Sequence, residues 1–284
     1  MTHSRTLFVA ACFGLLALFP LVAGNYGIDF VTKIMVYAIF ALSLELLVGG
    51  TGLVCFGQAA FFGIGAYTAV LLSPESEAAS LLWLLPASVL LAAAYALVVG
   101  ALSLRTKGVY FIMVTLAFSQ MVFFFYLQTP FTGGEDGIQA VPRGQLFGLI
   151  NLEDNFNMYI FVLTIFLMGF LLIWRVIQSP FGQILKAIRE HPDRATSLGY
   201  DTDTFKLLAF VISGALAGTA GATKSLVFQL ASLTDVHWSM SGEVVLMTLV
   251  GGMGTLFGPV VGAAVIVSLQ NYLAQLGAWV TIIQ

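Results

Sequence analysis

Residues 158–175 (MYIFVLTIFLMGFLLIWR) and 205–223 (FKLLAFVISGALAGTAGAT) are apolar runs that flank the polar stretch 179–206 (SPFGQILKAIREHPDRATSLGYDTDTFK). The polar stretch holds four basic and four acidic residues, out of 11 basic and 14 acidic in the whole chain. Each apolar run approaches the roughly 20 residues that a helix needs to cross about 30 Å of hydrocarbon. The pattern predicts two membrane-spanning helices joined by a segment that lies in water.

The rest of the chain has the composition of a membrane protein. Its residues are 59% hydrophobic and 9% charged, against about 25% charged in an ordinary globular chain. Apolar runs recur at 7–23, 30–48, 57–72, 81–103, 108–127, 158–175, 205–223, 242–257 and 259–276. They are too long and too uniform for barrel strands, which alternate over about 10 residues. We predict an all-α fold, a polytopic helical bundle of eight to ten spans in which residues 1–284 form one transmembrane domain.

The distribution of Lys and Arg predicts the orientation. If the spans alternate from a cytoplasmic N-terminus, one side receives Arg5, Arg105, Lys107, Arg175, Lys186, Arg189, Arg194 and Lys206, and the other receives only Lys33, Arg143 and Lys224. An excess of Lys and Arg marks the cytoplasmic side. The loop at about 179–204 is then cytoplasmic, between the sixth and seventh spans, and the loop at about 129–157 is extracytoplasmic. The glycine-broken run after Gly251 fits either a further span or a re-entrant turn, which leaves the side of the C-terminus open.

The cytoplasmic loop carries its own helix signals. Ser179 suits an N-cap and Pro180 the first helical position. Pro192 should end or kink the helix, and Gly199 suits the left-handed position after a second short helix. Apolar residues at helical spacing give the first helix one apolar face, which consists of Phe181, Ile184, Leu185 and Ile188. The residues alone fit an interfacial linker on lipid headgroups or a docking element, and the balanced charge disfavours simple binding to anionic lipid.

Four stretches of the chain resemble the membrane subunits of branched-chain amino-acid ABC transporters, of the LivM type. They are 42–71 (LSLELLVGGTGLVCFGQAAFFGIGAYTAVL), 104–118 (LRTKGVYFIMVTLAF), 179–222 (SPFGQILKAIREHPDRATSLGYDTDTFKLLAFVISGALAGTAGA) and 243–263 (EVVLMTLVGGMGTLFGPVVGA). Thr132-Gly133-Gly134 in the outer loop also resembles an element of that family. The chain departs from the family where it has Glu45 in place of a frequent Asn, and Gln58 in place of a frequent His.

The resemblance implies a function and a set of partners. The partners are a second homologous permease subunit, two cytoplasmic ATPases that bind ATP and Mg, and an extracytoplasmic binding protein, all at a bacterial inner membrane. The cytoplasmic helix would be the coupling segment that contacts an ATPase, through Phe181, Gly182, Ile184, Leu185, Lys186, Ile188, Arg189 and Glu190. We expect the contact face to consist of Phe181, Ile184 and Leu185, with Arg189 and Glu190 setting the register.

The chain has no signal for chemistry of its own. It lacks a GxxxxGK[ST] loop for phosphate, and Gly252-x-Gly254 lies in apolar sequence without a strand before it. Its three histidines have no acidic partner at catalytic spacing, and Cys12 and Cys55 form no disulfide or metal pattern. We therefore expect that this chain is not an enzyme, that it binds no metal and no cofactor of its own, and that it has no nucleic acid partner.

Glycines mark the places where helices pack closely or break. Gly214 and Gly218 form a GxxxG pair, which suits close packing within this subunit or a seam that transmits movement of the loop. Gly49, Gly50 and Gly52 resemble Gly251, Gly252 and Gly254 in context, either as an internal repeat or by chance. Broken backbone at membrane depth must be buried in protein or face a cavity. These two segments are our candidates for lining or gating the path.

Polar residues in the apolar runs are candidates for the translocation path. Ionisable residues within spans are costly and point to function. The candidates are Glu45, Gln58, Tyr67, Thr115, Gln120 and Glu243. The two glutamates also fit span ends, where they would reach the interface, and the other four also fit interhelical hydrogen bonds.

Two functions remain at this stage. One is the permease subunit of an ATP-driven importer of branched-chain or related amino acids. The alternative is a self-contained, ion-coupled secondary transporter or channel for a small polar solute. The alternative predicts several buried ionisable relay groups, and the chain offers only two marginal ones. The resemblance implies a leucine-type amino acid as the substrate by default, and leaves urea, an amide or another amino acid open.

Overall fold

The computed structural model describes residue 14 and residues 16–21, 24–73, 81–139, 145–146, 150–152 and 154–283. Its helices are α2 (Asn25–Thr51), α3 (Gln58–Leu71), α4 (Leu81–Ser103), α5 (Val109–Gln128), α6 (Asn155–Gln178), α7 (Pro180–Glu190), α8 (Pro192–Ser197), α9 (Thr202–Phe228), α10 (Trp238–Gly251) and α11 (Gly258–Ile283). The remaining elements are 3₁₀ turns η1 (Phe19–Leu21), η2 (Pro130–Thr132), η3 (Gly134–Asp136) and η4 (Leu233–Asp235), and two-residue strands β1 (Ile138–Gln139), β2 (Gln145–Leu146), β3 (Ile150–Asn151) and β4 (Leu230–Ala231).

The described part of the chain is a helical membrane domain. By length and composition, five helices can cross a membrane: α2, α4, α5, α6 and α9. α3 and residues 258–274 are shorter apolar helices. The expected first span at 7–23 lies largely outside the described residues. The all-α class is confirmed, and the number of eight to ten spans stays a prediction.

Helix α9 lies at the centre of the bundle, packed against α2, α3 and α4. A Cβ added at Gly214 would lie 2.4 Å from Cβ of Ala96, and one at Gly218 would lie 2.4 Å from Cβ of Ala92. The absent side chains let α4 approach α9 closely, the role of small residues in membrane helix packing. The GxxxG pair therefore packs helices within this subunit, the first of the two expected roles.

Two helix pairs have the same broken form. α2 ends at Thr51 and α3 begins at Gln58, whereas α10 ends at Gly251 and α11 begins at Gly258. Each break, 52–57 and 252–257, opens on a glycine with positive φ, 75° at Gly52 and 97° at Gly252. This shared helix–break–helix form agrees with the internal repeat hypothesis.

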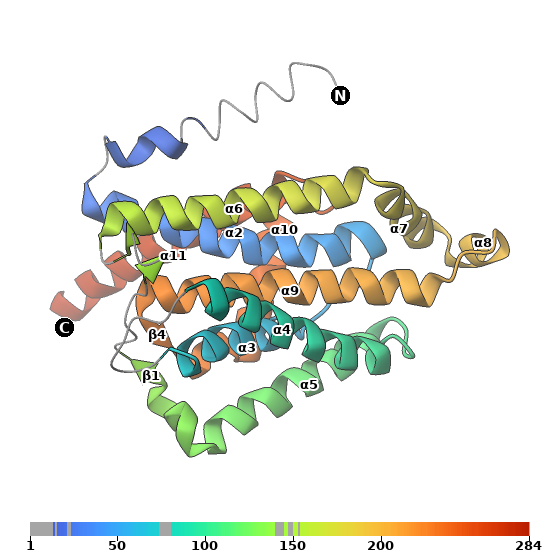
Figure 1. Cartoon of the computed structure of the whole chain (residues 1–284), viewed down its shortest axis with the longest axis horizontal. Helices are drawn as coiled ribbons and strands as arrows, with labels where there is room; N and C mark the ends of the chain where they lie inside the picture. Colours follow the sequence, from blue (N-terminus) through green and yellow to red (C-terminus); the bar gives the residue numbers. More distant parts are fainter. Residues whose placement is uncertain are drawn as a thin grey trace.

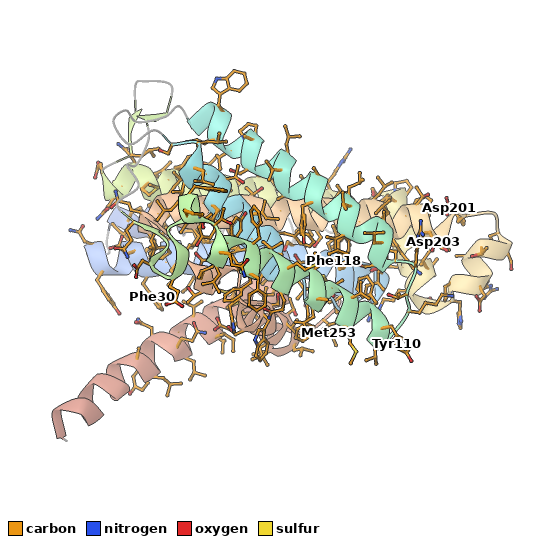
Figure 2. All side chains as sticks on the ribbon, turned by 90° about the horizontal axis from the view of Figure 1, so that it is seen from below. Phe30, Tyr110, Phe118, Asp201, Asp203 and Met253 are labelled. Carbon is orange, nitrogen blue, oxygen red and sulfur yellow. The ribbon has the colours of Figure 1, made fainter. Side chains whose placement is uncertain are left out.

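The two ends of the bundle differ. α7 and α8 lie together at one end, and β1 and β4 lie at the other (Figure 1). Asp201 and Asp203, at the start of α9, lie toward the α7 end, as does Tyr110, whereas Phe30 near the start of α2 lies toward the opposite end (Figure 2). β1 pairs with β4 in antiparallel register, Ile138 with Ala231 and Gln139 with Leu230. Part of the expected outer loop at 129–157 is thereby fixed to the connection that follows α9.

Candidate functional site

The helix α7 begins and ends where its local signals predict. The hydroxyl oxygen of Ser179 accepts a hydrogen bond of 3.3 Å from the backbone N–H of Gly182, and Pro180 is the first helical residue. α7 ends at Glu190 and Pro192 opens α8. Gly199 follows α8 with φ of 89°. The predicted pair of short helices at 179–199 is confirmed.

The apolar face of α7 packs onto the chain itself. Gly182, Leu185 and Ile188 are buried, with Leu185 only 1% exposed. Phe181 and Ile184 are half-buried, and Phe181 stacks on Phe205 with ring centroids 5.6 Å apart. The face covers α2, α6 and α9. This corrects the expectation that Leu185 lies on the partner-facing surface: an amphipathic helix turns its apolar side to its own core.

The opposite face of α7 is open to solvent and charged. Lys186, Arg189 and Glu190 are exposed. Of these three, Arg189 also makes a long-range contact, because its Nη1 donates a hydrogen bond of 2.8 Å to the carbonyl of Gly49 in the last turn of α2. All three charged side chains are accessible to a partner, and Lys186 and Glu190 make no such long-range contact among the described residues.

The two glycine breaks meet beside Arg189. Oε1 of Glu45 in α2 accepts a hydrogen bond of 2.6 Å from the backbone N–H of Gly254 in the second break. Glu45 is 2% exposed, and its Oε2 has no hydrogen-bond partner among the described residues. A Cβ at Gly49 would lie 3.3 Å from Cα of Gly254. The structure therefore brings Glu45, Gly49, Arg189 and Gly254 into one cluster, which we call the inner cluster. From the sequence, Glu45 is a path candidate, Gly49 and Gly254 are packing or gating candidates, and Arg189 is a residue of the ATPase contact.

Gln58, at the start of α3, belongs to a buried hydrogen-bond chain. Its Nε2 donates to Oγ of Ser213 over 2.8 Å, and that hydroxyl donates to the carbonyl of Ser43 over 2.6 Å. The next backbone N–H, that of Ala59, donates to Oγ of Ser241. Gln58 thus joins α3 to α2 and α9, which fits the interhelical role expected as the alternative to the path. Its Oε1 is buried without a partner among the described residues.

Further path candidates lie in α3 and α5, and Thr115 lies beside Gly57, the residue before Gln58: a Cβ at Gly57 would lie 3.4 Å from Cβ of Thr115. Tyr67 stacks on Tyr126 at 4.3 Å between ring centroids, and its buried hydroxyl has no partner among the described residues. Thr115 is buried and donates to the carbonyl of Ile112 in its own helix. Gln120 is half-buried.

Glu243 has a polar neighbour from the C-terminal helix. Its Oε2 accepts a hydrogen bond of 3.1 Å from Nε2 of Gln270. The side chain is half-buried in α10 and contacts α11 through this bond. An interhelical bond of this kind satisfies a carboxylate that hydrocarbon would leave unpaired.

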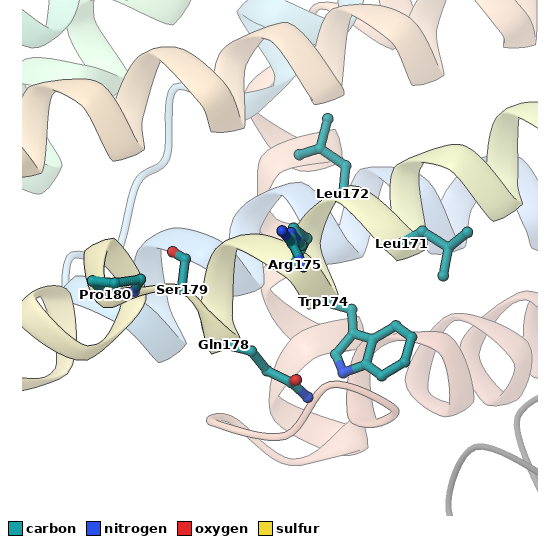
Figure 3. Close-up of a pocket in the computed structure, with 7 residues that line it drawn as sticks. All are labelled: Leu171, Leu172, Trp174, Arg175, Gln178, Ser179 and Pro180. Carbon is teal, nitrogen blue, oxygen red and sulfur yellow. The ribbon is translucent and has the colours of Figure 1, made fainter. Parts of the chain in front are cut away.

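A cavity of about 680 Å³ lies where α6 meets α7, lined by Leu171, Leu172, Trp174, Arg175, Gln178, Ser179 and Pro180 (Figure 3). Its lining mixes leucines with an exposed arginine, as expected where a membrane helix meets the aqueous interface. None of the predicted path residues is among those lining residues.

Sequence reasoning missed a buried ion pair. Nζ of Lys224, in α9, lies 2.7 Å from Oδ2 of Asp235, in η4. On the sequence alone, Lys224 is counted only on the side of the membrane opposite the cytoplasmic loop. The available signal was a lysine at the end of one apolar run and an aspartate shortly before the next. No group of three or more His, Cys, Asp or Glu side chains in the described part of the chain could hold a metal ion.

Comparison with known proteins identifies the family. The family described as branched-chain amino acid transport system / permease component matches residues 27–284. The chain belongs to this family. Over 94% of its length it is 31% identical to the high-affinity branched-chain amino acid transport system permease protein LivM of Escherichia coli (strain K12), of which it covers 68%. It is 26% identical, over 83% of the chain and 79% of the relative, to the probable branched-chain amino acid transport permease protein LivM of Methanocaldococcus jannaschii.

Similarity extends in part to a permease with another stated cargo. This chain is 28% identical to the autoinducer 2 import system permease protein LsrC of Photorhabdus laumondii, over 37% of this chain and 34% of that relative. No solved structure matches. The permease is the membrane subunit of an ABC importer, and members of its family lack an ATPase site of their own. This decides against the self-contained transporter or channel.

Proposed function

We propose that the permease carries branched-chain or related amino acids across a bacterial inner membrane. The observation that carries this substrate class is the 31% identity to a LivM permease over nearly the whole chain. The importer would contain a second homologous permease subunit, two cytoplasmic ATPases that bind ATP and Mg, and an extracytoplasmic binding protein. A difference in ligand affinity between outward-open and inward-open states would make the cycle directional.

We place α7 and α8 in the cytoplasm, between the spans at 158–175 and 205–223. The excess of Lys and Arg on this side supports the placement. The helices α3, α10 and α11 would cross the membrane together with α2, α4, α5, α6 and α9, which makes eight spans in addition to the one expected at 7–23. The loop at 129–157 would then lie outside and help to dock the loaded binding protein.

We assign the ATPase contact to the charged face of α7. Lys186 and Glu190 are exposed there, and the apolar face of the same helix packs on α2, α6 and α9. A push or pull on the charged face would therefore be passed to three membrane helices. The bound ATPase would shift α7, and the attached spans would switch the path between its outer and inner openings.

Co-purification tests this assignment. We expect the two ATPases to remain bound to a tagged permease, and the double charge reversal Lys186→Glu with Glu190→Lys to release them, because like charges would then face each other. The control is Arg105→Glu, because Arg105 is exposed between α4 and α5 and its reversal also changes a charge at the α7 end of the bundle. Uptake of leucine by the permease alone in ATP-free liposomes would contradict the importer assignment.

The substrate class is tested on the partner binding protein. We expect it to bind leucine, with urea and a simple aliphatic amide as weak competitors. Tight binding of urea and none of leucine would refute the amino-acid assignment and leave the importer assignment intact.

A further inference from the structure

We propose that Arg189 is a positioning residue of the inner cluster: it holds the two glycine breaks together there, so that movement of α7 releases both breaks at once. The inference rests on the proposed function in one respect, that the ATPases move α7. Arg189 then acts through contacts within the permease, whereas the sequence predicted that this residue sets the register of the ATPase contact.

The C-terminal end of α2 is capped in part by Arg189. The last carbonyls of a helix have no partner within it. The N–H groups of Gly52 and Leu53 satisfy the carbonyls of Val48 and Leu47. The carbonyl of Gly49 is instead bound by the guanidinium of Arg189. A cation at a helix C-terminus is also favoured by the helix dipole. Arg189 therefore completes the cap of α2 from a different element, α7.

The capped end of α2 is also bonded to the second break, 252–257. Glu45, one turn before Gly49, binds the N–H of Gly254 through Oε1. Nη1 of Arg189 lies 3.6 Å from the point where a Cβ of Gly254 would stand, and Cγ of Arg189 lies 3.3 Å from the corresponding point on Gly52. One arginine side chain thus lies beside both breaks, 52–57 and 252–257.

The contact between Glu45 and Gly254 leaves no room for a side chain at position 49. A Cβ at Gly49 would lie 2.0 Å from Oε1 of Glu45, closer than any real contact. Any side chain at position 49 would displace the carboxylate from Gly254. The glycine is therefore required for the bond between Glu45 and the second break, beyond its freedom in backbone conformation.

The helix α7 is the element whose movement would open the cluster. Leu185 of α7 is buried, and its Cδ1 lies 3.6 Å from the Cβ position of Gly50. α7 is thus seated on the end of α2, and its displacement must break the bond from Arg189 to Gly49. The cluster should accordingly stay closed until the ATPases shift α7.

Cys55 offers a native probe of this closure. It lies in the first break and is fully buried, with Sγ accepting from the N–H of Gly57. In a Cys12→Ser background it is the only cysteine, and opening of the break would expose it to N-ethylmaleimide. The experiment uses the whole importer in lipid nanodiscs without nucleotide.

We expect Arg189→Met to raise the labelling rate of Cys55 about tenfold, the factor that loss of one charged hydrogen bond represents. Arg189→Lys, which keeps a cationic donor, should give a smaller increase. Gly49→Ala should raise the rate with the arginine unchanged, and Arg105→Met should leave it at the wild-type value.

Three results are informative against the proposal. An unchanged labelling rate in Arg189→Met with both ATPases still bound would overturn it. Loss of the ATPases with Cys55 still protected would also overturn it, by making Arg189 a partner contact. If Arg189→Met does not fold, as judged by gel filtration, protection of Cys55 in both Arg189→Lys and Gly49→Ala would overturn it. Failure of the proposed function is seen separately, as failure of the wild-type permease to retain the ATPases.

Discussion

Lys224 and Asp235 form an ion pair within the protein interior, with Nζ and Oδ2 2.7 Å apart and the two side chains 9% and 2% exposed. Asp235 also accepts a hydrogen bond of 3.1 Å from the N–H of Ser232, and Lys224 donates to the carbonyl of Leu230 over 3.4 Å. The pair therefore ties the turn between α9 and α10 to the end of α9. Val236, next in the chain, packs on Gly63 of α3.

Removing one partner of this pair should destabilise the permease strongly. We expect Lys224→Met or Asp235→Asn to lower stability by about 3–5 kcal/mol, because each leaves an uncompensated polar or charged group in the interior. The double variant Lys224→Met with Asp235→Leu should cost less than either single change. Thermal unfolding in detergent measures the effect, with Lys107→Met as the exposed control. Single variants as stable as the control would show that the pair is solvated.

The close approach of α4 and α9 gives a second prediction. Gly218→Ala places a methyl group against Cβ of Ala92, and overpacking of this kind costs about 1–3 kcal/mol. Adding Ala92→Gly should recover much of the loss, because the two positions share one contact. Gly242→Ala is the control, since nothing lies within 4 Å of its Cβ position. A loss in the double variant as large as in Gly218→Ala would contradict the packing explanation.

Acid should weaken the start of α9. The pKa of Asp201 is lowered because the hydroxyl and the backbone N–H of Thr204 donate to its carboxylate. A lowered pKa in the folded state means a contribution to stability that is present above the ordinary aspartate value of about 3.9 and is lost as pH falls through the folded pKa. Asp201→Asn should therefore lower the melting temperature at pH 6 and make no difference in strong acid. A difference that persists unchanged in strong acid would contradict the role of the charge.

Local chemistry explains what the sequence alone could predict. Three signals act within a few residues and have the predicted role: Ser179 caps α7, α7 ends just before Pro192, and Gly199 is left-handed. Five of the predicted apolar runs likewise coincide with the described helices that are long and apolar enough to cross a membrane. Membrane helices satisfy their own backbone, so that length and composition carry most of the information.

Contacts between distant segments could not be predicted in this way. Arg189 meets Gly49 from 140 positions away, and Glu45 meets Gly254 from 209 positions away. The helical spacing of α7 correctly gave an apolar face, yet could not say whether that face meets its own chain or a partner. The burial of Leu185 in the core shows that the apolar face meets its own chain. Only the packing of α7 on α2 distinguishes the two roles.

The end of the bundle opposite α7 gives a functional prediction. Gly137 has φ of 66° and ψ of −167°, a region that only glycine adopts readily, and its Cβ position lies 2.3 Å from the carbonyl of Ala231. Gly137→Ala should strain the β1–β4 pair by about 1–3 kcal/mol. If this end docks the loaded binding protein, the affinity for that protein should fall about tenfold, the factor that 1.4 kcal/mol represents.

Two measurements check the effect of Gly137→Ala. Hydrogen exchange should increase in β1 and β4, and titration with the loaded binding protein should show weaker stimulation of ATP hydrolysis at equal ATPase content. Gly199→Ala is the matched control, because Gly199 also has positive φ, 89°, but follows α8 at the other end. Faster exchange at β1 and β4 with unchanged affinity would show that the binding protein docks elsewhere. An equal loss of affinity in Gly199→Ala would show that the effect is not specific to the β1–β4 end.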